Sequence, residues 1–174
     1  MNSMECPELD ATALVGTRDA AHAYAQILGD WRAAALRSVA LAMNQFRAGI
    51  REETRPIQIW PHHFDLAMFW LPGEKIPGQD PDDAEMSDQQ MNFGFSFGDA
   101  DIPEPCFYIT AYPLPDTLPD SPLPVGTTWQ SAGFSGAVLL YRTLLENSDP
   151  SEYLVNLWNG LLVAGRQQML THQA

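Results

Sequence analysis

The spacing of hydrophobic residues changes twice along this chain, and it predicts helices at both ends with strands between them. No proline occurs from residue 18 to residue 48, and apolar residues recur there at three- and four-residue steps, which is typical of an amphipathic helix. We expect Thr17 to be its N-cap and Gly29 to be a point where it bends or divides. The apolar stripe consists of Tyr24, Ile27, Leu28, Trp31, Ala35, Val39, Ala42 and Phe46.

A second helix is predicted near the C-terminal end. Asp149, Pro150 and Glu152 follow the pattern of an N-cap, a first-turn proline and a capping-box acid. Gly160 and Gly165 lie inside this helix, where each costs about 1 kcal/mol relative to alanine. We therefore expect both glycines to pack closely against a sheet or another helix. The stripe of this helix consists of Leu154, Leu157, Trp158, Leu161, Gly165 and Met169.

The middle of the chain has the two-residue period of strands. In residues 91–97 the aromatic residues alternate with smaller ones, and in residues 106–112 Cys106, Tyr108, Thr110 and Tyr112 share one face opposite Phe107, Ile109 and Ala111. Residues 57–59 also alternate before Pro61. Residues 66–71 are all apolar, which suits a strand covered on both faces, and residues 137–141 are expected to form the last strand. The sequence therefore predicts an α+β fold, in which a mainly antiparallel sheet of about four to five strands packs against N- and C-terminal helices.

Length and linkers suggest how the chain is organised. A chain of 174 residues is about one domain, so we predict a single domain over residues 1–174, with a flexible tail at residues 1–16. Residues 113–124 are rich in proline. They are expected to form a stiff ordered loop or an exposed polyproline-like strap.

Charge limits the classes of partner. The formal charge is −13, from 22 acidic and 9 basic residues, and Lys75 is the only lysine. Binding to nucleic acid or to an anionic membrane needs clustered basic residues, so neither partner is expected. The first residues lack the basic and apolar regions of a signal peptide, and no apolar stretch approaches the length of a membrane span. Cys6 and Cys106 lie in unrelated segments, which suits a reducing compartment, so we expect a cytoplasmic protein.

The segment WPHHFDL places titratable groups beside apolar runs. If the chain is extended from His62, then His63 and Asp65 face the same way, about 6–7 Å apart along the strand. This spacing suits a shared metal ion or a buried imidazole–carboxylate pair. We favour the pair, because closed zinc sites usually need four ligands, and we expect neither a metal nor a cofactor.

An acidic turn, a serine-containing string and a set of aromatic residues are further candidate sites. Asp101 and Glu104 lie in a carboxylate-rich turn, which is typical either of acid–base chemistry or of a polar hairpin loop. The string Gly94-Phe95-Ser96-Phe97-Gly98 matches a nucleophile elbow, but Pro103 and Pro105 prevent the helix that an elbow requires, so we treat the match as coincidence. A candidate aromatic surface consists of Trp60, Trp70, Tyr108 and Tyr112.

Several strings together resemble one protein family. They are WPHHFDLAMFWLPG, MNFGFSFGDADIPEPCFYITAYPLP, LLYRTLL and, more weakly, AYAQILGDWRAA. This chain resembles the bacterial domain-of-unknown-function family 5996 over roughly residues 57–169, with a weaker match near 21–35. Members of that family are usually longer, with further strands before the Phe-Asp-Leu segment, and tend to carry Trp-Pro where this chain has Ser96-Phe97. The resemblance implies no established activity, cofactor or catalytic residue.

We expect a non-catalytic protein that binds a small apolar or aromatic ligand, or a protein partner, through the aromatic sheet surface. One alternative is a metal-dependent enzyme centred on His62, His63 and Asp65, and another is a structural homo-oligomeric subunit. The many large aromatic residues favour a homodimer whose interface includes the long N-terminal helix, with Trp31 or Phe46 at or near the contact.

Overall fold

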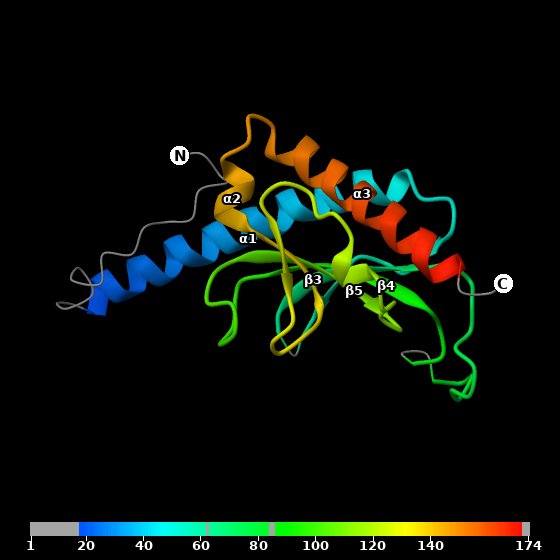
Figure 1. Cartoon of the computed structure of the whole chain (residues 1–174). Helices are drawn as coiled ribbons and strands as arrows, with labels where there is room; N and C mark the ends of the chain where they lie inside the picture. Colours follow the sequence, from blue (N-terminus) through cyan, green and yellow to red (C-terminus); the bar gives the residue numbers. More distant parts are fainter. Residues whose placement is uncertain (1–17, 62, 84–85, 172–174) are drawn as a thin grey trace. The chain divides into compact units, whose positions relative to one another are not determined.

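The structure is a computed structural model that describes residues 18–61, 63–83 and 86–171, except for the side chains of residues 18–24 and 171. The chain has two compact units, residues 1–41, which hold most of the first helix, and residues 42–174. The helices and strands, shown in Figure 1, are α1 (Arg18–Ala48), β1 (Glu53–Thr54), β2 (Gln58–Trp60), β3 (Asp65–Leu71), β4 (Gln90–Ser96), β5 (Cys106–Tyr112), the 3-10 helix η1 (Leu118–Asp120), β6 (Thr127–Gln130), β7 (Gly136–Leu140), α2 (Tyr141–Leu145) and α3 (Pro150–Thr171).

The predicted N-terminal helix is confirmed as α1. Trp31, Ala35 and Val39 are buried at four-residue intervals along it, whereas Ile27, which we placed on the same stripe, is 45% exposed. The expected N-cap Thr17 and the expected tail at residues 1–16 lie outside the described residues. None of the described helices has the length and apolar character needed to cross a membrane.

The α+β class and the antiparallel sheet are confirmed, but the expected number of strands is too small. Among the described residues the sheet has seven strands in the order β1-β3-β4-β5-β7-β6, with β2 also paired to β3. All of these pairs are antiparallel. The strands that we missed are β1 and β6, which are short and only partly buried, so they lack the alternating pattern that reveals a half-buried strand.

One face of the sheet carries an aromatic core. Phe93 on β4 lies 4.8 Å from Phe46 at the end of α1, measured between ring centroids, and Phe46 lies 5.5 Å from Trp158 on α3. Phe46 has no exposed surface, so it belongs to the core of the chain, and the expectation that Trp31 or Phe46 lies at or near a dimer contact stays a prediction. Figure 1 shows α3 lying across this face of the sheet.

The helix α3 begins as the sequence predicts. The backbone N–H of Glu152 donates to Asp149 Oδ1 at 2.9 Å, which is an N-cap bond. A Cβ at Gly165 would lie 2.3 Å from Met91 Sδ, which confirms the predicted close packing against the sheet. A Cβ at Gly160 would meet nothing within 4 Å, so the prediction of close packing is wrong there, because that position faces outward.

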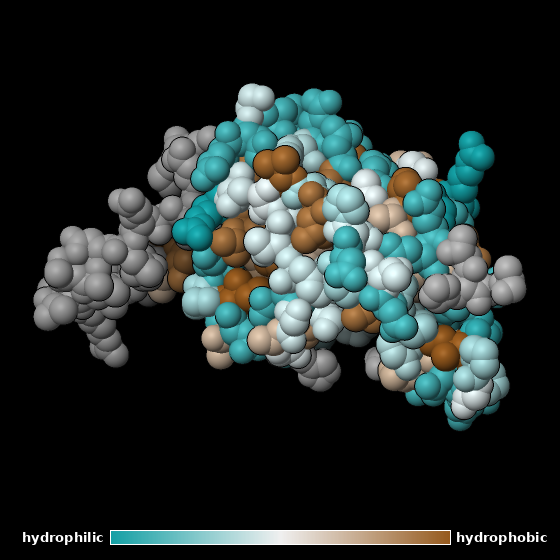
Figure 2. Space-filling view, in the orientation of Figure 1, coloured by the Kyte–Doolittle hydropathy of each residue, from teal (hydrophilic) through white to brown (hydrophobic). Residues whose placement is uncertain are grey.

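The proline-rich segment is an ordered loop rather than an exposed strap. Leu118 in η1 is buried, and Thr117 Oγ1 donates to Gln168 Oε1 of α3 at 2.9 Å. The amide Nε2 of Gln168 donates to Ser121 Oγ at 2.6 Å. The loop is therefore fastened to α3 on both sides of η1. On the face seen in Figure 2, hydrophobic residues form separate patches among hydrophilic ones.

Candidate functional site

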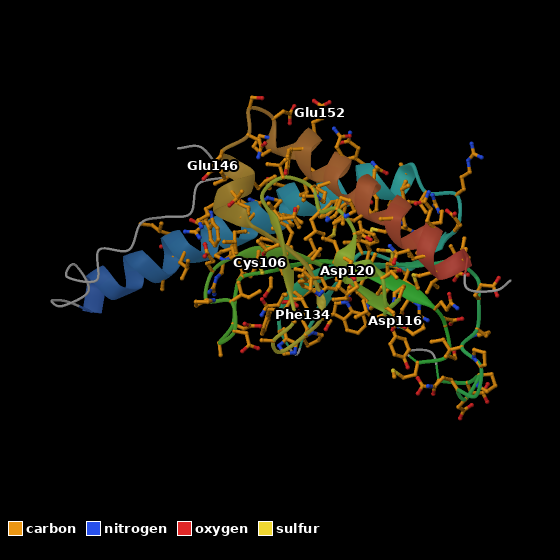
Figure 3. All side chains as sticks on the ribbon, viewed as in Figure 1. Cys106, Asp116, Asp120, Phe134, Glu146 and Glu152 are labelled. Carbon is orange, nitrogen blue, oxygen red and sulfur yellow. The ribbon has the colours of Figure 1, made fainter. Side chains whose placement is uncertain are left out.

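The second face of the sheet is polar where the strands β4 and β5 cross it. Residues of a strand point alternately to opposite faces, so Asn92, Gly94 and Ser96 lie opposite the phenylalanines of β4. The antiparallel register pairs Asn92 with Thr110, Gly94 with Tyr108 and Ser96 with Cys106. These six residues lie together on the face turned away from α3, which we call the open face. Figure 3 shows Phe134 on this side of the sheet.

Two adjoining hollows lie on the open face. The first, of about 350 Å³, is lined by three carboxylates, Asp65, Asp99 and Asp101, and we call it the acidic hollow. The second, of about 490 Å³, is lined by Trp60 and Phe69, and we call it the aromatic hollow. Four residues line both hollows, namely His63, Asp65, Asn92 and Tyr108. The two hollows therefore form one groove with a shared wall.

The ring of Tyr108 forms part of this wall because Gly94 leaves room for it. A Cβ at Gly94 would lie 2.1 Å from Tyr108 Cζ and 2.4 Å from its hydroxyl oxygen, so the ring lies directly over the glycine. The hydroxyl hydrogen-bonds to the side chains of Asp65 and Asn92, which reach it from β3 and β4. Burial, together with the nearby charge of Asp65, raises the pKa of Tyr108, so the phenol stays neutral at physiological pH.

Several buried polar atoms of the groove are unpaired. Asp65 Oδ1 and Asn92 Oδ1 are inaccessible to solvent and have no hydrogen-bond partner among the described residues. The indole Nε1 of Trp60 in the aromatic hollow is in the same state within the described ranges. A buried polar atom without a partner costs about 1–3 kcal/mol, so these atoms destabilise the fold as it stands.

Two loops border the acidic hollow. Asp99 Oδ1 accepts hydrogen bonds from the backbone N–H groups of Asp101, at 2.8 Å, and of Ile102, at 2.9 Å. Asp101 lies against Gly133 of the β6–β7 loop, where a Cβ would be 2.3 Å from Asp101 Oδ2. Gly133 also has a φ of +80°, a conformation that favours glycine. The two loops therefore meet at the rim of the groove.

Cys106 lies in the wall of the acidic hollow and is not set up as a nucleophile. Its side chain is buried, and burial, followed by the charges of Asp99, Asp65 and Glu104, raises the pKa of the thiol to about 12. Reactive cysteines have lowered pKa values and lie near positive charge. Cys106 therefore remains a neutral thiol at physiological pH.

The structure brings together His63 and Asp65, although for a different reason from the one expected. The chain is not extended there, because Pro61, His63 and Phe64 lie in turns and Phe64 has a φ of 56°. Asp65 is the first residue of β3, and both residues line both hollows. His62, the third residue of this candidate, lies outside the described residues. In the described ranges, His, Cys, Asp and Glu form no group of three or more that could hold a metal ion.

Of the two acids predicted in the turn after β4, only Asp101 lines the groove. Glu104 instead pairs with Arg142 of α2, with 3.2 Å between Glu104 Oε2 and Arg142 Nε, so its inclusion in the site is not supported. Ser96 lines the acidic hollow, and its Oγ accepts a hydrogen bond from the N–H of Gly98 at 3.2 Å. The chain then returns as the antiparallel strand β5 and not as a helix, so the nucleophile-elbow geometry is absent here.

The predicted aromatic surface is wrong for Trp70. Trp60 and Tyr108 line the groove, but Trp70 is fully buried on the helix-covered face, with the guanidinium carbon of Arg166 5.5 Å from its ring centroid. Tyr112 lies beyond the lining of both hollows, where its hydroxyl accepts a hydrogen bond from Gln79 Nε2 at 3.5 Å. The error for Trp70 has a simple cause, since β3 is apolar on both faces and its sequence does not show which face is covered.

Phe69, Asn92 and Phe134 are among the groove residues that the sequence analysis did not predict. Asn92 had a signal, because it alternates with the apolar stripe of its strand and so shares a face with Ser96. Phe69 lies within the continuous apolar run of β3, and Phe134 lies in a loop with no periodic pattern. Neither could be placed before the pairing of the strands was known.

The comparisons with known proteins identify a family but no activity. No curated protein and no solved structure matches the chain. A model described as "Family of unknown function (DUF5996)" matches residues 31–167, which include the whole groove and both helices that follow the sheet as far as residue 167. The chain therefore belongs to the family of unknown function DUF5996.

Proposed function

We propose that this protein binds a small ligand with an apolar or aromatic part, without covalent chemistry, in the groove on the open face. The observation that carries the proposal is the pair of adjoining hollows, about 350 Å³ and 490 Å³, that share a wall of polar side chains. Small-molecule sites are typically concave, largely apolar and fitted with a few oriented polar groups. The aromatic hollow supplies the apolar surface, and Asp65, Asn92 and Tyr108 supply the oriented groups.

The local chemistry favours binding over catalysis. The thiol of Cys106 is held in its protonated form, and Ser96 Oγ accepts a backbone hydrogen bond. The Tyr108 hydroxyl is shared between a carboxylate and an amide, an arrangement that orients all three groups. A metal-dependent enzyme around His63 and Asp65 is the alternative. One equivalent of metal in the purified protein, lost in His63→Ala, would favour it.

Location and assembly are part of the same proposal. We infer a cytoplasmic protein from the acidic composition and the pair of cysteines in unrelated segments. A homodimer is supported by exposed apolar side chains, of which Val125 is 88% and Phe64 70% exposed. Light scattering at micromolar concentration tests the dimer, and a monomeric mass would overturn it.

Trp60 provides a direct test of binding in the groove. The chain has five tryptophans, so their indole N–H signals can be separated in an NMR spectrum and the Trp60 signal identified with Trp60→Phe. Titration with a panel of small aromatic compounds, 2-phenylethanol among them, should shift the Trp60 signal while that of the buried Trp158 stays in place. Shifts confined to other residues, or none at all with any compound, would contradict the proposal.

A further inference from the structure

We propose that the natural ligand of the groove is an arylalkylamine type of molecule, with a protonated amine in the acidic hollow and a flat aromatic body in the aromatic hollow. This inference rests on the proposed function, because it assigns a ligand class to the same groove. It is carried by the distribution of charge along the groove and by the kind of hydrogen-bonding atom that is unpaired in each hollow.

The charge differs between the two hollows. Asp65, Asp99 and Asp101 line the acidic hollow, and no lysine or arginine does so among the described residues. Arg55 is the cationic residue of the aromatic hollow, and its Nη2 lies 3.8 Å from Asp88 Oδ2, while its guanidinium carbon lies 6.0 Å from the Phe69 ring centroid. A cleft lined by one sign of charge concentrates ligands of the opposite sign. The acidic hollow therefore favours the cationic end of a ligand.

The unpaired atoms give independent support. In the shared wall they are Asp65 Oδ1 and Asn92 Oδ1, and both accept hydrogen bonds but cannot donate them when Asp65 is ionised. The Tyr108 hydroxyl already interacts with both side chains, and Asp65 Oδ1 and Asn92 Oδ1 are still left without a donor among the described residues. An ammonium group has three N–H donors and a positive charge, so it can pair with both oxygens when these two side chains turn toward the hollow.

The aromatic hollow differs from the acidic hollow, because the rings of Trp60 and Phe69 line it and its unpaired atom is a donor. Its unpaired atom is the donor Nε1 of Trp60, and the Trp60 and Phe69 rings meet edge to face, with centroids 5.6 Å apart and an interplanar angle of 84°. Such a corner presents apolar faces to a flat ring. A metal cation would satisfy the carboxylates, but it would leave the apolar hollow and the Trp60 donor without a role.

Three compounds that share a phenylethyl skeleton separate charge from shape. These are 2-phenylethylamine, 2-phenylethanol and phenylacetate, titrated at pH 7 into the full chain and followed by calorimetry and by the Trp60 indole signal. We expect the amine to bind at least about tenfold more tightly than the alcohol, and phenylacetate to bind more weakly than the alcohol. Only the affinity of the amine should fall as sodium chloride is raised.

The matched variants are Asp65→Asn and Asp120→Asn. Asp120 is an exposed carboxylate in η1, outside the groove, and Figure 3 labels it. Asp65→Asn should abolish the preference for the amine, so that the amine and the alcohol then bind with similar Kd values, and Asp120→Asn should leave the preference as it is in the native chain. If Asp65→Asn fails to fold, the salt dependence measured on the native chain still decides the question.

The possible outcomes test the ligand class and the proposed function separately. Equal affinities for the amine and the alcohol, or tighter binding of phenylacetate, would overturn the ligand class and leave the proposed function standing. Failure of all three compounds, together with every other aromatic compound of the panel, would overturn the proposed function itself. Tight binding of a divalent metal at Asp65, competing with the amine, would also overturn the ligand class.

Discussion

The two faces of β4 and β5 are made by alternate residues of the same strands, yet they differ in every physical respect. On the helix-covered face, Phe93, Phe95 and Phe107 have no exposed surface, and the Phe95 and Phe107 rings lie 5.1 Å apart. On the open face, Asn92 and Tyr108 border hollows and Asn92 keeps an unpaired oxygen. The first face resembles the interior of any stable domain, whereas the second resembles a binding site.

The difference shows which face of the sheet is less favourable for the stability of the fold. Close packing of aromatic side chains stabilises the covered face, where the indole Nε1 of Trp158 is also buried without a hydrogen-bond partner among the described residues. The open face has buried polar atoms that an apolar replacement would spare, and such departures from good packing tend to occur at functional sites. The contrast between the two faces is therefore a stronger argument for function than any single motif of the sequence.

The largest expected effect comes from truncating the covered face. Phe93→Ala removes a fully buried ring that contacts Phe46, so the free energy of unfolding should fall by about 3–5 kcal/mol. Thr110→Ala, at a hollow on the open face, should change it by no more than about 1 kcal/mol. Urea denaturation of both variants measures the comparison. Equal losses of unfolding free energy in the two variants would mean that the two faces do not differ in how tightly they are packed.

A smaller effect should come from lifting Tyr108 off the sheet. Gly94→Ala places a methyl group 2.1 Å from Tyr108 Cζ, so the ring must move, and we expect a loss of about 1–3 kcal/mol together with weaker binding of aromatic probes. Gly160→Ala is the matched control, because a Cβ there meets nothing within 4 Å in α3. It should stabilise the protein by about 0.5–1 kcal/mol and leave binding unchanged. Unimpaired binding in Gly94→Ala would remove Tyr108 from the wall of the groove.

The last expected effect concerns alkaline pH. In the folded protein the pKa of Cys106 is raised from its ordinary value of 9.0 to about 12. Between these values the folded state retains a proton that the unfolded state has released, so stability is complete below pH 9 and falls as pH rises toward 12. One such group contributes at most about 1.4 kcal/mol per pH unit, and the raised pKa of Tyr108 acts in the same direction.

The variant Cys106→Ala separates the contribution of the thiol. Its free energy of unfolding, measured from pH 8 to pH 11, should fall less steeply than that of the native chain. Thr110→Ala, which changes the same face without removing a titratable group, should follow the native slope. Parallel curves for all three proteins would show that the wall around Cys106 is neither dry nor acidic in solution.

Much of the fold follows from local pattern. The bounds of α1 and β5 agree with those predicted, and the Asp149 N-cap forms the expected bond. In each case a residue's neighbours in sequence carry the information, through helical spacing, two-residue alternation or capping chemistry. The strands β1 and β6 escaped prediction because short strands at the sheet edges depend on pairing with a neighbour.

The candidate site was less accessible to prediction. His63, Asp65, Asp101, Trp60 and Tyr108 were predicted as candidates and do line the groove. Glu104, Trp70 and Tyr112 were candidates of the same kind and do not line it. The candidates that line the groove and those that do not are of similar residue types, so residue type alone cannot separate them. The difference depends on which face of the sheet the helices cover and on where the loops after β4 and β6 meet.

The sequence by itself determined the helical ends, the alternating strands, the excess of acid and the family. Only the tertiary structure decided that Tyr108 lies over Gly94, that its hydroxyl meets Asp65 from a strand two places away, and that two unpaired acceptors remain in the wall between the hollows. The physical reason is that periodicity is a property of neighbours along the chain. A binding groove is made by side chains that the antiparallel register brings together from distant segments, and nothing in their local spacing specifies that meeting.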